Sequence, residues 1–130
     1  MAAVQDKKMI SEPFSNEVEL VRATWDFDVD GGAIGQHELL EAQGTVVVML
    51  KAAIVLDPVL SGGALTLSVG EAAGAEFISA WPKANMDGDE HKSGLVPIKI
   101  TSGEKVNMSL AVTPATRGKI EFIFEVMKVN

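Results

Sequence analysis

The sequence predicts an all-β fold: an antiparallel β-sandwich in a single domain, for which a jelly roll is one arrangement. Several short runs alternate between apolar and polar side chains, as half-buried strands do. Turn signals rich in glycine, proline, asparagine and aspartate separate these runs. No regular alternation of helices and strands, which would favour a parallel sheet, is visible. The 130 residues thus hold about seven or eight expected strands.

Residues 1–16 are expected to form an extended arm ahead of a sandwich domain at residues 17–130. They show no period, contain Pro13, and offer Phe14 as a large apolar anchor for a contact. A frayed terminus is an equally good interpretation of such a segment. No signal peptide is expected, because the segment is charged and lacks a long apolar run.

The first clear strand is expected at residues 23–30, where apolar side chains alternate with Thr24 and three aspartates. Trp25 falls on the apolar side and is expected in the core. Gly31 and Gly32 predict a turn, after which residues 36–40 could pair back as a hairpin.

Residues 45–56 are apolar on both faces. Their β-branched content and the bounding Gly44 and Asp57-Pro58 favour a strand or a bent pair of strands, although the length also permits a buried helix. Residues 65–69 alternate cleanly and predict another strand. Residues 70–83 fit either a short helix ended by Pro82 or an irregular crossing.

Residues 85–94 are expected to form an exposed polar loop, and residues 95–100 a strand that Pro97 places at a sheet edge. Two alternating runs, at 106–112 and 120–127, flank a short loop and predict a hairpin. Ile123 and Met127 make the outer face of the last run more apolar than contact with water favours. Both are therefore candidate interface residues, covered by the arm or by another subunit.

Composition excludes several function classes. The net charge of −7 disfavours nucleic acid, because binding to phosphate needs lysine and arginine. The absence of cysteine excludes disulfides, thiolate metal sites and a cysteine nucleophile. The longest apolar stretch is interrupted by Lys51 and is shorter than the roughly 20 residues of a membrane helix. The expected partners are therefore proteins or small molecules, and no association with a membrane is expected.

No motif for catalysis, a metal or a cofactor is found. Residues 87–90 resemble the start of a calcium loop but lack its distal glutamate, so an exposed loop is the better interpretation. Asp26, Asp28 and Asp30 are expected on one side of a strand that faces water. The alternative interpretation is that they form a docking face for a basic partner. A small hydrolase or lyase would have to use Asp26, Asp28, His37 or His91.

Aromatic residues are few, with two tryptophans and no tyrosine, which disfavours carbohydrate recognition. Trp81, beside Pro82 in an irregular segment, is the tryptophan better suited to an exposed contact. Together with the 85–94 loop it would support an adhesive or receptor-binding role.

The stretch 22–33, Arg-Ala-Thr-Trp-Asp-Phe-Asp-Val-Asp-Gly-Gly-Ala, resembles the opening strand and turn of small structural proteins of tailed bacteriophages. Residues 61–64 and 118–122 are similar to later features of those sequences, so the resemblance spans roughly residues 22–129. It implies a capsid decoration (cement) protein or a related virion component. Such proteins are compact β-sandwiches, often trimeric, that sit outside the shell and bridge capsomers. The two-sided apolar run and the many acidic residues depart from this pattern.

The sequence therefore predicts a non-enzymatic virion protein that decorates and stabilises a phage capsid, with a tail or fibre component as the alternative. Its expected partners are the major capsid protein and further copies of itself, with a trimer favoured. The expected location is the capsid surface, after assembly in the host cytoplasm, where the absence of cysteine suits the reducing conditions.

Overall fold

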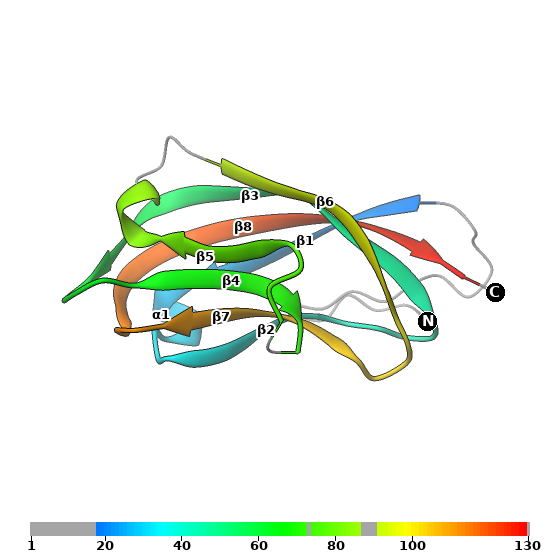
Figure 1. Cartoon of the computed structure of the whole chain (residues 1–130), viewed down its shortest axis with the longest axis horizontal. Coiled ribbons are helices and arrows are strands. Elements are labelled where there is room, and N and C mark those ends of the chain that lie inside the picture. The colour runs from blue at the N-terminus through cyan, green and yellow to red at the C-terminus, as the bar shows by residue number, and fades with distance from the viewer. Residues whose placement is uncertain (1–17, 73, 87–90, 130) are drawn as a thin grey trace.

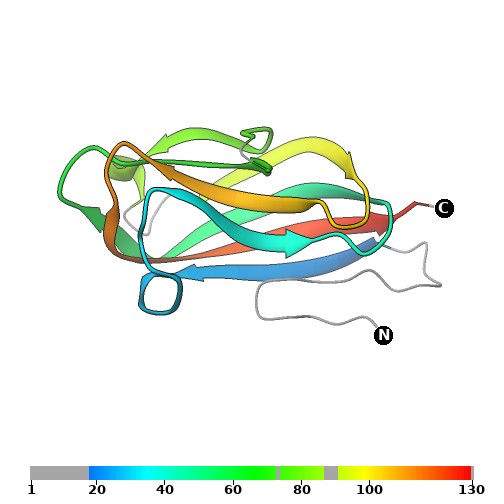
Figure 2. The ribbon, with the colours of Figure 1, turned by 90° about the horizontal axis from the view of Figure 1, so that it is seen from below.

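The computed structural model describes residues 18–72, 74–86 and 91–129. Eight strands form two four-stranded antiparallel sheets that lie face to face (Figures 1 and 2). The elements in chain order are β1 (Val18–Asp26), α1 (Phe27–Asp30), β2 (Gly35–Glu41), β3 (Val46–Ser61), β4 (Thr66–Glu71), β5 (Ile78–Pro82), the 3-10 helix η1 (Lys83–Asn85), β6 (His91–Ile100), β7 (Lys105–Ala111) and β8 (Ala115–Lys128). The predicted all-β antiparallel sandwich is confirmed.

The strand order defines the sandwich as a jelly roll. One sheet has the order β1-β8-β3-β6 and the other β2-β7-β4-β5. Within the described residues, β4 and β5 are the one pair of consecutive strands that hydrogen-bond to each other. The other six connections all cross from one sheet to the other. This interleaving is the double Greek key of an eight-stranded jelly roll.

The core lies between the two sheets. Trp25 is fully buried, as its phase predicts, and its indole nitrogen donates a hydrogen bond to the carbonyl oxygen of Gly31 at 2.9 Å. Phe122 and Phe124 from β8 are fully buried, and Phe77 packs edge-on against Phe124 with ring centroids 6.0 Å apart. Burial of each such large side chain contributes roughly 1.5–3 kcal/mol to folding.

The prediction of a strand at residues 23–30 is wrong in its second half. β1 ends at Asp26, and residues Phe27–Asp30 form one helical turn. The carboxylate of Asp26 caps this turn by accepting from the backbone N–H of Asp28 at 3.0 Å. Aspartate favours such caps over strand positions. The three aspartates therefore do not share one face of a strand.

Both predicted hairpins are also wrong. β2, at the predicted 36–40, pairs with β7 in the opposite sheet and not with β1. β7 and β8 exist as predicted but belong to different sheets, so the loop between them is a crossover. In that loop Val112 has a φ of 78°, a left-handed conformation that is rare for β-branched residues.

Residues 45–56 form a strand, as their β-branched content indicates, but it does not stop at Asp57-Pro58. β3 continues to Ser61, and its pairing with β8 shifts register between Asp57 and Leu60. Proline is tolerated in a strand at such an irregularity, because no ladder hydrogen bond is demanded of it there.

The described residues of the 70–83 segment, 70–72 and 74–83, form no α-helix. β4 continues to Glu71, β5 follows at Ile78–Pro82, and η1 is a single 3-10 turn. β6 begins at His91, so the predicted loop is shorter than residues 85–94, and residues 87–90 lie outside the described residues. Pro97 lies in β6, which is an edge strand as predicted.

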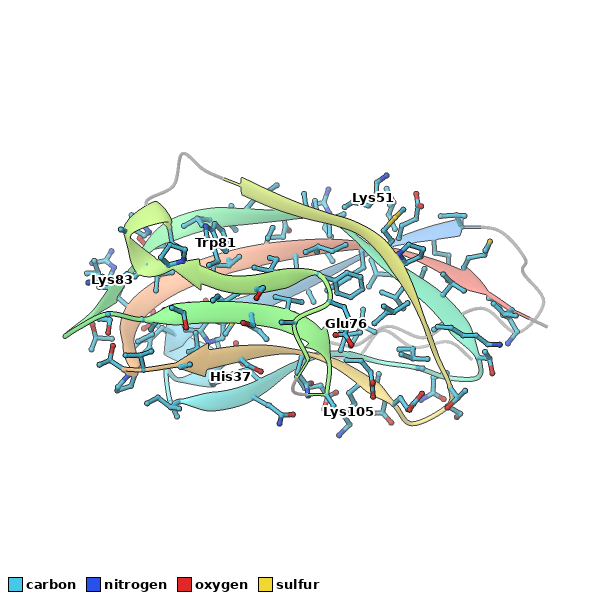
Figure 3. All side chains as sticks on the ribbon, viewed as in Figure 1. His37, Lys51, Glu76, Trp81, Lys83 and Lys105 are labelled. Atoms are coloured by element: carbon cyan, nitrogen blue, oxygen red, sulfur yellow. The ribbon has the colours of Figure 1, made fainter. Side chains whose placement is uncertain are left out.

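The prediction of an exposed Trp81 is wrong. Its side chain is only 1% exposed, because β5 pairs with β4 in a register that places Trp81 opposite the buried Leu67 (Figure 3). β5 does not alternate regularly: its pairing with β4 shifts register between Leu67 and Val69, and Ala80 has a φ of 50°. This bulge places two exposed residues between Ile78 and Trp81, so both of these side chains enter the core. Among the described residues, no helix is long and apolar enough to cross a membrane.

A candidate interface on the outer face of one sheet

The outer face of the β1-β8-β3 sheet carries a continuous group of apolar side chains, which we call the apolar band. These side chains alternate with buried ones along each strand and are partly or largely open to solvent. The band consists of Val18, Leu20, Val47, Met49, Ala52, Ile54, Ile123 and Met127. Leu20 is 68% exposed and Val18 49%, values unusual for large apolar residues in a strand.

The register of the three strands makes the band continuous. Met127 lies opposite Val18 on one side and opposite Val47 on the other, which gives an unbroken apolar row across the sheet. Two rows further along β8, Ile123 lies opposite Ala52 on β3 and opposite Arg22 on β1. In the row between them, Leu20 and Met49 lie on either side of Glu125. Side chains in directly opposite positions are about 5 Å apart, so the members of each row contact one another. Leu20 and Met49 connect the rows on either side of Glu125.

Charged residues of opposite sign are interspersed in the band. Arg22 lies 3.8 Å from Glu121, Lys51 lies 3.9 Å from Glu125, and Lys119 lies 3.9 Å from Asp26. Lys51 extends outward from β3 (Figure 3). Exposed pairs of this kind contribute roughly 0–1 kcal/mol each to stability. Their larger consequence is that the band has little net charge.

The outer face of the opposite sheet has a different character. Its outward residues on β4 and β7 are small and polar, among them Thr66, Ser68 and Ser109. Beside them the amide of Asn107, which is 6% exposed, donates to the side-chain oxygen of Gln36 at 2.8 Å. This face shows the polar outward pattern of a sheet in contact with water. The apolar band is therefore a property of one sheet only.

A cleft of about 420 Å³ lies at one end of the β1-β8-β3 sheet and is lined by residues of β1, α1, β3 and β8. Arg117 donates to a carboxylate oxygen of Asp57 there at 3.0 Å, and this bond and the charge of Asp57 raise the pKa of the guanidinium. Asp26 and Asp28 also line the cleft. The carboxylates thus face cations of the chain itself, which makes the cleft a set of surface ion pairs.

The residues that a hydrolase or lyase would need are not assembled. His37 packs edge-on against Trp25, with ring centroids 6.5 Å apart, and its Nε2 lies 2.8 Å from the carbonyl oxygen of Ala33. It does not line the cleft that contains Asp26 and Asp28. The side chain of His91 lies outside the described residues. In the part of the chain that is described, no group of three metal-binding side chains occurs.

Two of the four predicted interface residues lie in the band. Ile123 is half-buried and Met127 is 39% exposed, both on the outer side of β8. Phe14 lies outside the described residues, and Trp81 is a core residue. Sequence reasoning missed Val18 and Leu20. Their signal was present, because both alternate in phase with the first strand.

A second exposed apolar group lies in the loops at one end of the sandwich. Val29 is 77% exposed, Val112 63% and Ile34 54%. The loop that contains Val112 is held by Thr113, whose hydroxyl donates to the carbonyl oxygen of Ala64 at 2.7 Å. These side chains occupy separate turns and form no continuous surface with the band.

The fold defines the chain as a jelly roll, and comparison with solved structures finds this fold in phage capsids. A chain in the capsid of Ralstonia phage GP4 is 20% identical, with 94% of this chain and 92% of that chain covered and a TM-score of 0.67. A chain in the acid-stable capsid of Helicobacter pylori bacteriophage KHP30 is 15% identical, with coverages of 85% and 86% and a TM-score of 0.57. A chain in the cyanophage Pam1 capsid asymmetric unit is 18% identical, with coverages of 92% and 90% and a TM-score of 0.56.

No family model matches the chain, and no curated protein sequence matches it. At these low identities the three structural matches show a shared fold. Because each alignment covers nearly equal shares of both chains, the matching chains are close to this one in length. The shared fold therefore extends over 85–94% of this chain.

Proposed function

We propose that this protein is a non-enzymatic structural component of a phage virion that decorates and stabilises the capsid by bridging capsomers. One observation carries the proposal: the fold matches, over nearly its whole length, chains of similar size in three phage capsid structures. The resemblance of residues 22–33 to small phage structural proteins supports it independently.

The charge of the chain favours a position outside the shell. With a net charge of −7, the protein is repelled by the phosphates of packaged DNA. A subunit lining the interior would face that repulsion at every copy. We therefore place this protein on the capsid surface, with the major capsid protein as its partner, after assembly in the host cytoplasm.

A decoration protein acts through binding alone. When it binds the assembled shell and not the free subunits, it stabilises the shell by mass action. A homo-oligomer that touches several capsomers gains avidity without stronger individual contacts. We favour three copies, and we assign residues 1–16 the role of an arm that adds contacts to neighbours.

The alternative, a tail or receptor-binding component, has lost its main support. It relied on an exposed Trp81, and that side chain is buried. The other tryptophan, Trp25, is buried as well, and Phe27 is half-buried against the core. The described residues thus present no exposed aromatic platform for a glycan.

The test mixes the purified protein with phage shells that lack it and separates bound from free protein by sedimentation. The proposal expects saturable binding at a fixed ratio to the shell subunits, and a higher dissociation temperature for decorated shells. Failure to bind any cognate shell, with strong binding to host cells instead, would favour the tail alternative.

A further inference from the structure

The strongest unexplained feature of the molecule is the apolar band. β3 is apolar on both faces over most of its length, and this two-sided pattern is typical of strands in sheets that are covered on both sides. Within the described residues, the inner side chains Val46, Val48 and Leu50 are buried, whereas the outer ones between them are only half-buried. Next to them on β8 lies the exposed Met127, and the exposed Leu20 follows on β1, across β8.

We propose that the apolar band is the contact surface for a second copy of this chain. The inference deepens the proposed function and rests on it for its biological setting, because it names the surface through which the decorating oligomer forms. In a pair, the band meets the same face of its partner. In a ring of three, it meets a different surface of the next copy.

Charge is the first argument for a second copy as the occupant. Two chains of net charge −7 repel each other, so they associate best where the local charge is balanced. In the band, Glu121 and Glu125 each have a cation within 4 Å, Arg22 and Lys51 respectively. The helical turn α1 carries Asp28 and Asp30 and no basic residue. Arg117, the cation with which Asp28 interacts in the cleft, is already paired with Asp57.

Position is the second argument. β1 is an edge strand of its sheet, with β8 as its one neighbour among the described residues. The exposed Val18 and Leu20 carry the apolar surface onto this edge strand. A copy lying over the band can therefore also approach the side of the sheet, where no described strand pairs with β1.

Size is the third argument. Three strands about 4.8 Å apart and nine residues long present roughly 400 Å² of flat sheet, to which side chains add relief. A stable interface buries about 800 Å² on each partner. The band therefore supplies about half of such a contact, enough for an association that depends on concentration and on flanking residues.

The experiment compares two full-length variants by light scattering over a concentration series. Leu20→Glu places a carboxylate in the band, and Val29→Glu makes the same chemical change on α1. Both side chains are largely exposed, 68% and 77%, so neither substitution should disturb the fold. Circular dichroism checks that both variants stay folded. A second band variant, Met127→Glu, repeats the test on β8.

We expect the unaltered protein and Val29→Glu to form oligomers, and Leu20→Glu and Met127→Glu to weaken self-association at least about tenfold, or 1.4 kcal/mol. A protein that is monomeric at every concentration overturns the inference, as do band variants that associate like the unaltered chain. Shell binding is measured in parallel. Oligomers unaffected by Leu20→Glu together with lost shell binding would mean that the band contacts the capsid. Dissociation by Leu20→Glu in a protein that never binds shells would keep this inference and reject the proposed function.

Discussion

The hydroxyl groups of Ser61 and Thr113 lie 2.8 Å apart, although 52 residues separate them in the sequence. Ser61 ends β3, and Thr113 lies between β7 and β8, so each residue belongs to a connection that passes from one sheet to the other. The Ser61 hydroxyl also lies 2.9 Å from the carbonyl oxygen of Pro114, and its single proton is shared between this oxygen and Thr113. Two crossovers of the jelly roll are thereby tied together at one end of the sandwich.

Replacement of Thr113 by valine should loosen this tie. The change keeps the shape of the side chain but removes the hydroxyl that bonds to Ala64 and Ser61, so we expect a loss of about 1–2 kcal/mol of unfolding free energy. Urea unfolding measures the loss. Thr116→Val, at an exposed position, serves as the control and should change stability by less than about 0.5 kcal/mol. Equal effects of the two substitutions would refute the role of Thr113.

Replacement of Val112, next to Thr113, should increase the stability of the fold. Its φ of 78° is strained for a β-branched residue and its side chain is 63% exposed, so little packing is lost when it is replaced. Val112→Gly is expected to raise stability by about 1 kcal/mol through relief of this strain. Ala111→Gly, one residue earlier and within β7, should lower stability instead, because glycine weakens a strand. Thermal unfolding of the two variants tests whether Val112→Gly raises the unfolding temperature while Ala111→Gly lowers it.

Gly32 is required by a close approach of two backbones. A side chain at this position would collide with the carbonyl group of Ala115, and the Gly32 oxygen accepts a hydrogen bond from the Ala115 N–H at 2.8 Å. Gly32→Ala should therefore cost about 1–3 kcal/mol, as other overpacking substitutions do. Gly62→Ala meets open space and should be nearly neutral. A neutral Gly32→Ala would show that the loop after α1 does not sit against β8.

Trp81→Ala tests whether this tryptophan belongs to the core. A buried tryptophan replaced by alanine typically costs about 3–5 kcal/mol, whereas an exposed contact residue changes the free energy of unfolding by less than about 0.5 kcal/mol. We expect the large loss, because 99% of the side chain is shielded from water. Ile123→Ala, at a half-buried site of the band, should cost clearly less.

Stability should depend weakly on pH through Glu104. Its carboxylate accepts hydrogen bonds from the backbone N–H and the hydroxyl of Thr101, at 2.7 and 2.9 Å, and these bonds lower its pKa below the usual 4.5. Because the pKa is lower in the folded state, the contribution is present above pH 4.5 and is lost as the pH falls through the folded-state pKa. Glu104→Gln should differ from the unaltered protein at neutral pH, and the difference should shrink in acid. A difference that stays constant with pH would contradict this.

The strands were predictable from the sequence, and their pairing was not. Alternation marked most of the strands, because one face of each is buried in the core. It contains no information about which sheet a strand joins. The runs at 106–112 and 120–127 are adjacent in sequence and both amphipathic, yet Thr113 and Pro114 lead the chain across the sandwich instead of back along β7.

Part of the candidate interface was predictable for the same reason. Ile123 and Met127 were recognisable because apolar residues occupied the outer phase of a strand whose inner phase was already clear. Leu20 lies ahead of the run that looked like the first strand, so its phase became visible only once β1 was seen to begin at Val18. Trp81 was mispredicted because the strand that contains it is short and follows a glycine- and alanine-rich segment. Too few residues remain for the sequence to show which side chains of this strand face the core.

The central claim, that this chain is a capsid decoration protein, is tested most directly by its binding to assembled and unassembled forms of the cognate major capsid protein. Sedimentation with preformed shells and, in parallel, with dissociated subunits gives both affinities in one experiment. We expect saturable binding to shells at a fixed ratio and no measurable binding to free subunits, because a bridging protein recognises neighbours that exist only after assembly. Equal binding to both forms, or binding to neither, would contradict the claim.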